Sequence, residues 1–239
     1  MGYYPLSVTS DKFKYGRRQV WELPVRLTHW VTAASITVLI VTGFYITYPV
    51  GTSNGEPYRN FLMGWFREAH FIAGYALLFS FIVRGYWFFA GNKYARSGVP
   101  LVWRKSWWKS FFGQIVEYLG KVREPVTLGH NSLAGFSYFT MVGCLGLFQI
   151  VTGFALFGET NKGGFWDRIC GWVIPLLGGS FQTHVWHHFA AWGFMIFTLV
   201  HLYMVLFDSV RYKDGLISAI VSGDKFYEDG DLDNDDWVS

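Results

Sequence analysis

The sequence predicts an all-α membrane protein, a four-transmembrane-helix bundle with a cytoplasmic interfacial helix. Hydrophobic residues make up 51% of the 239 residues and charged residues only 15%, whereas a soluble domain carries about 25% charge. The apolar residues gather in four stretches, each with the roughly 20 residues that a helix needs to cross a bilayer. The chain is also rich in Trp and Tyr, with 12 and 14 residues, and these collect at water–lipid interfaces.

The four predicted spans are nearly free of charge. We place them at about residues 28–48, 68–90, 132–157 and 184–208. Together they form one membrane domain, residues 27–209, in which no internal repeat is evident. A basic segment precedes the first span, but it is not followed by a short apolar core and a small-residue cleavage site. We therefore expect the first span to be retained rather than removed as a signal peptide.

The segments outside the spans predict the orientation. Fifteen Lys and Arg residues lie in three of them, against four in the two remaining loops. The three basic segments are the N-terminal arm (1–26), the loop between the second and third spans, and the tail (210–239). Because basic segments stay on the cytoplasmic side, both termini and the middle loop are expected in the cytoplasm.

Two segments outside the spans have distinctive compositions. "WRKSWWKSFFGQIVEYLGK" (103–121) mixes basic and aromatic residues, which indicates an interfacial helix on the cytoplasmic leaflet. A loop helix packed on the bundle is the alternative. Residues 224–239 hold seven of the 17 acidic residues against one Lys, and we expect this acidic tail to be solvated. The basic residues lie between apolar runs, so no nucleic-acid partner is predicted.

Histidines are concentrated in the spans. Ionisable side chains within a membrane are candidates for function, although a single histidine near a helix end is often only solvated or hydrogen-bonded. Six of the seven lie within the predicted spans or at their ends: His29, His70, His184, His187, His188 and His201. In the predicted orientation, His29 and His201 lie toward the cytoplasm, whereas His70 and His187 lie toward the outside.

The fourth span carries histidines at two depths. His187 and His201 are 14 residues apart, which in a helix corresponds to about 21 Å along the axis and a net rotation of about 40°. Their rings therefore project from nearly the same face. His188 and His184 lie about 140° and 100° away from His201. Helical geometry favours His187 over these two, although a distorted start of the helix would change this.

Paired imidazoles at two levels of a helical bundle predict two non-covalent haem b groups. An iron with two axial histidines has no open position, which suits electron transfer, and bundle cores commonly hold such cofactors. Depth pairs His70 with His187 at the outer haem iron. It pairs His29 with His201 at the inner haem iron.

Other residues near these sites have two interpretations each. Arg84, 14 residues after His70, can pair with a haem propionate or snorkel to the cytoplasmic interface. Four glycines either leave room for porphyrin faces or allow close helix packing: Gly43, Gly74, Gly153 and Gly193. The two cysteines form no CxxC or CxxCH motif, so covalent haem, iron–sulfur and zinc sites lack ligands.

Seven segments form a distinctive series along the chain: "LPVRLTHW", "REAHFIAGY", "GNKYAR", "VWRKSWW", "GHNSLAGF", "VTGFALFGE" and "HVWHHFAAWGFMIFTLVHLYM". In their order and spacing they resemble the b-type cytochrome subunit of membrane-bound uptake nickel–iron (NiFe) hydrogenases. The likeness extends from about Trp21 to Gly223, and it implies a dihaem, four-span anchor that is also similar to the gamma subunit of formate dehydrogenases. In such complexes a periplasmic large subunit oxidises hydrogen and a small subunit relays electrons through iron–sulfur clusters. The cytochrome passes them to quinone in the respiratory chain of the bacterial plasma (inner) membrane.

The resemblance also assigns residues. It implies four haem ligands: His29 in "THW", His70 in "EAHF", His187 in "VWHH" and His201 in "VHLY". The "GHN" turn is similar to a quinone-site segment of formate dehydrogenase, which makes Asn131 a candidate quinone contact near His201. His130 is a candidate for proton uptake there, with a helix-start or loop role as the alternative.

The sequence therefore predicts a membrane-anchoring electron-transfer subunit, not an enzyme by itself, whose partners are the hydrogenase subunits, quinone and lipid. An anchor of a formate dehydrogenase or a similar oxidoreductase is the first alternative. A histidine-lined metal or proton transporter is an alternative of another class. It predicts carboxylates beside the imidazoles, and residues 30–48 and 133–157 contain none. A purely structural anchor does not explain histidines spaced 14 residues apart on one face.

Overall fold

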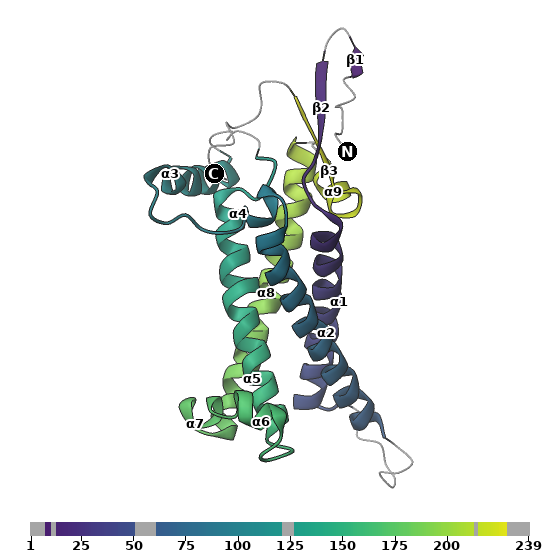
Figure 1. The fold of residues 1–239 in the computed structure, drawn as a ribbon, viewed down its shortest axis with the longest axis vertical. Coiled ribbons are helices and arrows are strands. Elements are labelled where there is room, and N and C mark those ends of the chain that lie inside the picture. Colours follow the sequence, from purple (N-terminus) through teal and green to yellow (C-terminus); the bar gives the residue numbers. More distant parts are fainter. Residues whose placement is uncertain (1–7, 11–12, 51–60, 121–126, 213–214, 229–239) are drawn as a thin grey trace. The chain divides into compact units, whose positions relative to one another are not determined.

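The computed structural model describes residues 8–10, 13–50, 61–120, 127–212 and 215–228. Helices dominate these residues (Figure 1), and four stretches are long and apolar enough to cross a membrane. They are α1 (Leu23–Thr47), α2 (Leu62–Ala90), the third span Ser132–Gly158 and α8 (Ser180–Tyr212). The predicted all-α class with four transmembrane helices is therefore confirmed.

Helices α1, α2 and α8 begin before the predicted spans, and the start of α8 has a local cause. Gly178 and Gly179 have φ angles of +94° and +109°, in the left-handed region that glycine adopts without steric cost. The helix begins directly after them at Ser180, four residues before the predicted start.

The third span is not a uniform α-helix. It consists of α4 (Ser132–Ser137), a π-helical segment η3 (Tyr138–Leu145) and α5 (Gly146–Gly158). A π-helical segment of this kind is rare and is often found beside functional sites.

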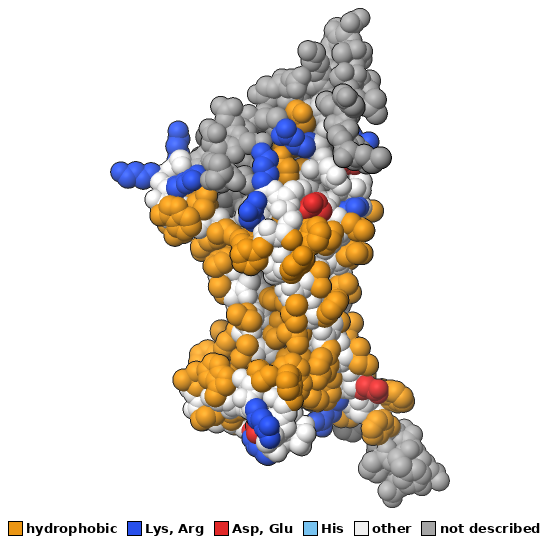
Figure 2. All heavy atoms as spheres, viewed as in Figure 1, with side chains coloured by type: hydrophobic (Ala, Val, Ile, Leu, Met, Phe, Trp, Pro, Cys, Tyr) orange, Lys and Arg blue, Asp and Glu red, His pale blue; other side chains and the backbone are white. Residues whose placement is uncertain are grey.

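The long helices expose apolar stripes. On α2 the exposed large side chains recur at intervals of three and four residues, which is one face of a helix: Ile72, Tyr75, Phe79, Ile82, Tyr86 and Phe89. The same spacing recurs on α8: Val185, Phe189, Trp192, Ile196, Leu199, Tyr203, Leu206 and Val210. Hydrophobic side chains cover much of the face shown in Figure 2. Soluble monomers rarely expose such large apolar patches, so these faces suit lipid and the chain is a multi-pass membrane protein.

The described residues form two compact units, and one of them comprises Thr28–Val83 and Gly143–Thr198. Its core is formed by Leu77, Ile150, Phe154, Ala155, Cys170 and Val173. Helix α5 packs there on the short helices α6 (Phe165–Cys170) and α7 (Val173–Leu176). Trp166 stacks on Phe154 with ring centroids 3.9 Å apart, and its Nε1 donates to the Tyr75 hydroxyl at 2.7 Å. These contacts connect α5 and α6 to α2.

The other unit comprises Met1–Leu27, Arg84–Val142 and Leu199–Ser239. Its core contains Val20, Trp21, Val25, Tyr94, Ala95, Leu128 and Ala219. An antiparallel sheet in the order β1 (Val8–Ser10), β2 (Phe13–Gln19), β3 (Asp224–Glu228) belongs to this unit. Strands β2 and β3 lie side by side (Figure 1), with Arg17 opposite Phe226. Arg17 also forms an ion pair with Asp224 at 2.5 Å.

The expectation that the acidic tail is solvated from residue 224 onward is wrong for β3. Lys225 is buried and donates to the Thr127 carbonyl at 3.3 Å. Helix α9 (Leu216–Ser222) ends at Gly223, which has a φ of +94° and accepts hydrogen bonds from the amides of Val20 and Trp21. This turn directs the chain onto β2. The rest of the tail lies outside the described residues.

The middle loop contains the 3₁₀ helix η2 (Lys93–Arg96) and helix α3 (Lys105–Tyr118). One face of α3 is packed, since Trp107 is buried with its ring 6.3 Å from that of Phe136. The opposite face exposes Trp108 and Phe112. The helix thus has both a packed face and an aromatic surface, and its place at the cytoplasmic leaflet stays a prediction.

Candidate functional site

His70 and His187 lie in one compact unit, and their rings face each other. The ring centroids are 6.5 Å apart and the planes are inclined at 66°. A metal–imidazole bond is about 2 Å long and the ring centroid lies about 1 Å behind the bonded nitrogen, so two axial imidazoles have centroids roughly 6 Å apart. The observed separation therefore fits one haem iron between the two rings.

A threonine on another span contacts each of these histidines. His70 Nδ1 is 2.8 Å from Thr42 Oγ1 on α1, and His187 Nδ1 is 2.8 Å from Thr152 Oγ1 on α5. Both threonines are buried, so water does not compete for these bonds. Because Nδ1 is occupied in each ring, Nε2 is the nitrogen left to bind a metal.

A glycine follows each threonine and lies against the same ring. A Cβ placed on Gly43 would lie 3.4 Å from His70 Cε1, and one on Gly153 would lie 3.2 Å from His187 Cε1. The second separation is tighter than most Cβ contacts in proteins. Any larger side chain at these positions would enter the space beside the imidazoles.

Two further observations fit a bound group at this position. A Cβ on Gly74, one turn after His70, would have no atom within 4 Å, which is open space rather than close packing. Gln149 Nε2 donates to the His187 carbonyl at 3.0 Å, whereas its buried Oε1 has no hydrogen-bond partner among the described residues. Such an oxygen usually bonds water or a ligand. A Cβ on Gly193, by contrast, would lie 3.1 Å from the Leu145 side chain.

The histidines beside His187 have other neighbours. His184 Nδ1 lies 3.0 Å from the Ser180 carbonyl of its own helix. His188 Nδ1 is 3.5 Å from Thr47 Oγ1, and its ring lies 5.0 Å from that of Phe44. Of the three, His187 is the one whose ring lies beside that of His70, and its role as a haem ligand stays a prediction.

The second predicted pair is distributed over both units. His29 lies in α1, half-buried and edge-on to Trp30 at 5.2 Å between ring centroids. His201 lies in α8 and is exposed. Because the two residues belong to different units, the pairing of His29 with His201 stays a prediction.

Asn131 connects the start of α4 to α3. Its Oδ1 accepts from the Ala134 amide at 2.7 Å, which caps the helix. Its Nδ2 donates to Gln114 Oε1 at 2.9 Å. This asparagine therefore has a structural role in the chain, and its predicted contact with quinone stays a prediction.

His130 and Arg84 both lie close to the ring of one tyrosine, Tyr138. His130 Nδ1 is 3.0 Å from Ser97 Oγ, and its ring stacks on Tyr138 with centroids 5.4 Å apart. The Arg84 guanidinium lies 5.7 Å from the Tyr138 centroid and donates to the Ala95 carbonyl at 2.7 Å. The contacts of His130 match a loop role. Its part in proton uptake, and that of Arg84 in binding a propionate, stay predictions.

A buried polar cluster joins α3 to the end of α8. Glu117 is 1% exposed, accepts a hydrogen bond from the Tyr212 hydroxyl and pairs with Arg211 at 3.5 Å. The next residue, Tyr118, donates to Asp208 at 3.0 Å. Burial, and then the negative charge of Asp208, raises the pKa of Tyr118, while hydrogen bonding from Asn131 opposes this. The phenol therefore stays protonated at physiological pH.

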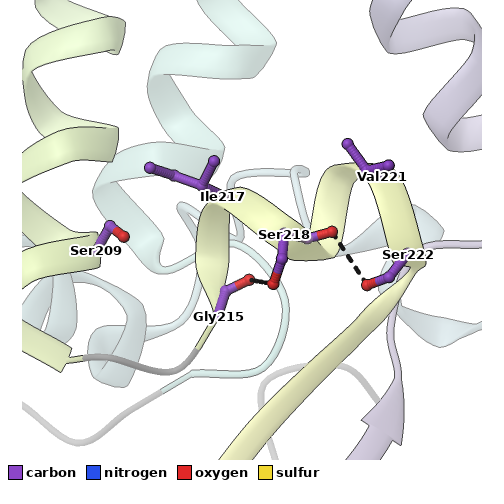
Figure 3. A pocket seen from close by; sticks show the side chains of 6 residues that line it. All are labelled: Ser209, Gly215, Ile217, Ser218, Val221 and Ser222. Atoms are coloured by element: carbon purple, nitrogen blue, oxygen red, sulfur yellow. Dashed lines mark hydrogen bonds between the residues drawn. The ribbon is translucent and has the colours of Figure 1, made fainter.

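A surface depression beside α9 has no comparable chemistry. Ser209, Gly215, Ile217, Ser218, Val221 and Ser222 line it (Figure 3). The Ser218 hydroxyl donates to Gly215 O at 2.8 Å and that of Ser222 to Ser218 O at 3.0 Å. These two hydroxyls are thus committed to the backbone of α9.

Sequence reasoning missed Thr42 and Thr152, although a signal was present. The pentapeptide "IVTGF" occurs at residues 40–44 and again at 150–154, in a chain interpreted as free of repeats. Each copy supplies the threonine and the glycine that contact one histidine. A search for short repeats within the spans would have found both.

A multi-pass helical protein whose span histidines face each other at the separation of two axial ligands has the construction of a membrane cytochrome. Such proteins hold haem between helices. The chain belongs to the prokaryotic cytochrome b561 family, whose model matches residues 20–223. This family is one of b-type cytochromes, which carry haem b.

The chain is similar to proteins named as probable Ni/Fe-hydrogenase B-type cytochrome subunits. It is 44% identical to the one from Azotobacter chroococcum mcd 1 over 214 residues, which covers 88% of this chain and 89% of the relative. The one from Cupriavidus necator is 41% identical, with 88% and 87% covered. The hydrogenase 1 subunit from Escherichia coli (strain K12) is 35% identical, with 90% and 93% covered. The resemblance found in the seven segments is thereby confirmed.

Proposed function

We propose that this chain anchors a periplasmic NiFe hydrogenase in the bacterial plasma membrane and passes its electrons to quinone. The observation that carries the proposal is the facing pair His70 and His187, with ring centroids 6.5 Å apart. The relatives supply the partner, since all three are named as hydrogenase cytochrome subunits. In this proposal the large subunit oxidises hydrogen, and the iron–sulfur small subunit delivers the electrons to the chain.

The four histidines are the proposed axial ligands of two haem b groups. His70 and His187 hold the outer iron, and His29 and His201 hold the inner one. Bound haem supplies reversible one-electron transfer, and two axial histidines keep oxygen from the iron. Arg84 is proposed to pair with a propionate, because a guanidinium has five donors and the Ala95 carbonyl takes one of them.

Quinone is proposed to bind near Asn131, with His201 and His130 as further contacts. Reduction of a quinone to a quinol consumes two electrons and two protons. Glu117 and Asp208 belong to the buried polar cluster that reaches Asn131 through Tyr118, and they are the proposed source of the protons. Proton uptake on the cytoplasmic side and hydrogen oxidation outside would together separate charge across the membrane.

The alternatives have less support. The relatives are named for hydrogenase rather than for formate dehydrogenase. A metal transporter needs a cluster of ligands, and across the part of the chain that the structure describes no three His, Cys, Asp or Glu side chains gather to hold a metal ion.

Haem quantification tests the proposal. Membranes containing the complete complex are reduced with hydrogen, and the reduced-minus-oxidised spectrum is combined with a pyridine haemochrome assay. We expect two low-spin b haems per chain, with one lost in H187A and one in H201A. The matched control is H188A, which alters the neighbouring imidazole and should keep both. Absence of haem at adequate haem supply, or loss of haem in H188A but not in H187A, contradicts the assignment.

A further inference from the structure

The two "IVTGF" segments reproduce one arrangement of atoms around two different histidines. Thr42 and Thr152 each place Oγ1 at 2.8 Å from an imidazole Nδ1. A Cβ on Gly43 would lie 3.4 Å from His70 Cε1, and a Cβ on Gly153 would lie 3.2 Å from His187 Cε1. The two copies lie on different spans, α1 and α5, and the two rings lie on α2 and α8. Chance packing would not be expected to place the same five-residue segment against both histidines.

The hydroxyl bonds determine which nitrogen of each ring carries the proton. Thr42 Oγ1 donates to the Val38 carbonyl at 2.6 Å, and Thr152 Oγ1 donates to the Phe148 carbonyl at 2.8 Å. A hydroxyl has one proton and two lone pairs, so an oxygen that donates to a carbonyl can only accept from the imidazole. Nδ1 must then be the protonated nitrogen, and the lone pair of Nε2 is directed away from the threonine.

We propose that the paired "IVTGF" segments are the supports of the outer haem site: Thr42 and Thr152 fix the tautomer and rotation of His70 and His187, and Gly43 and Gly153 keep the ring edges clear. This inference rests on the proposed haem between the two histidines. The four residues are positioning residues, since they act through the imidazoles and not on the iron. Ligand histidines generally need such an outer partner to set tautomer and basicity.

The arrangement has a consequence for the redox properties of the haem. An acceptor on Nδ1–H increases the basicity of the imidazole, and a more basic ligand stabilises ferric over ferrous iron. Removing the acceptor therefore raises the midpoint potential of that haem. The arrangement is the same on both sides, so the loss of either threonine should shift the same haem in the same direction.

Valine and serine variants test this inference in the whole complex. T42V and T152V remove the hydroxyl at nearly constant volume, whereas T42S and T152S keep it. The readouts are haem content, a redox titration followed by visible absorbance, and the low-spin EPR signal, which depends on the relative rotation of the two rings. We expect T42V and T152V to raise the midpoint potential of one haem and alter its EPR signal. The serine variants should remain close to the unaltered complex.

T37V is the matched control, because Thr37 on the same helix donates to the Ala33 carbonyl at 2.9 Å in the same way. It should leave both haems unchanged. The inference is overturned if T42V and T152V retain two haems with unaltered potentials and EPR signals. It is also overturned if the serine variants lose haem together with the valine variants, since packing rather than the hydroxyl then matters. A lack of haem in the unaltered complex would instead contradict the proposed function, so the two failures are distinguishable.

Discussion

At the scale of single residues, a side chain added at Gly153 should act directly on a proposed haem ligand. A Cβ there would already lie 3.2 Å from His187 Cε1, and the buried Thr152 holds the ring from the same helix. We expect G153L to push the imidazole out of place and to remove one haem per chain by pyridine haemochrome assay. G85A is the control, since its Cβ would meet no atom within 4 Å and alanine favours the helix. Two haems in G153L would show that the ring has room to move.

Some residues of the candidate site could be predicted from the sequence, and others could not. His187 could be chosen over His184 and His188 because rotation about a helix is fixed by residue number. Thr42 and Thr152 could not be chosen in this way. A threonine in an apolar helix usually bonds its own backbone, and both do so here. The additional contact with a histidine depends on which helices are neighbours, and sequence periodicity does not reveal that.

At the scale of elements, the four spans were predictable because length and apolarity are sufficient to detect a transmembrane helix. The π-helical segment Tyr138–Leu145 could not be predicted. It would show in the sequence only as a change in the spacing of apolar residues, and a stretch that is apolar on every side has no such spacing. Strand β3 was missed for a different reason. The acidic composition of the tail suggested solvation, whereas the register that pairs Asp224–Glu228 with β2 is set by a distant segment.

The contact between α3 and α8 leads to a prediction about proton supply. Glu117 is buried, and its Oε2 has no hydrogen-bond partner within the described ranges. A glutamine has nearly the same shape as a glutamate but no ionisable proton. We expect E117Q to lower hydrogen-dependent reduction of a soluble quinone analogue at least about tenfold, as for a lost general acid. Reduction of the haems by hydrogen should continue unchanged.

The pH profile distinguishes this role from a structural one. If Glu117 supplies protons, quinone turnover in E117Q falls further as the pH rises and protons become scarce, whereas E117D restores part of it. E22Q is the control for the loss of a hydrogen-bonded carboxylate outside this cluster. The Glu22 carboxylate accepts from Trp87 Nε1 at 2.9 Å and from the Asn92 amide at 2.8 Å. Turnover in E117Q equal to that of the unaltered complex at every pH would exclude Glu117 as the donor.

At the scale of the whole molecule, the distribution of charge predicts how the chain crosses the membrane. Fifteen Lys and Arg residues lie in the two terminal segments and the middle loop, against four in the other loops. Four apolar spans among the described residues predict that both termini lie on one side, and the basic residues predict that this side is the cytoplasm. In the proposed function, this orientation decides which haem would receive electrons from the hydrogenase and on which side quinone would take up protons.

Reporter fusions measure this orientation directly. Green fluorescent protein at the C terminus should fluoresce, and alkaline phosphatase inserted at Gly163, between α5 and α6, should be active because its disulfides form only outside the cytoplasm. Gly163 suits an insertion, since no atom lies within 4 Å of its would-be Cβ. In the control the two reporters are exchanged, and neither fluorescence nor phosphatase activity should then be observed. Activity in the exchanged arrangement would reverse the topology, and His70 and His187 would then hold the haem nearer to the cytoplasm.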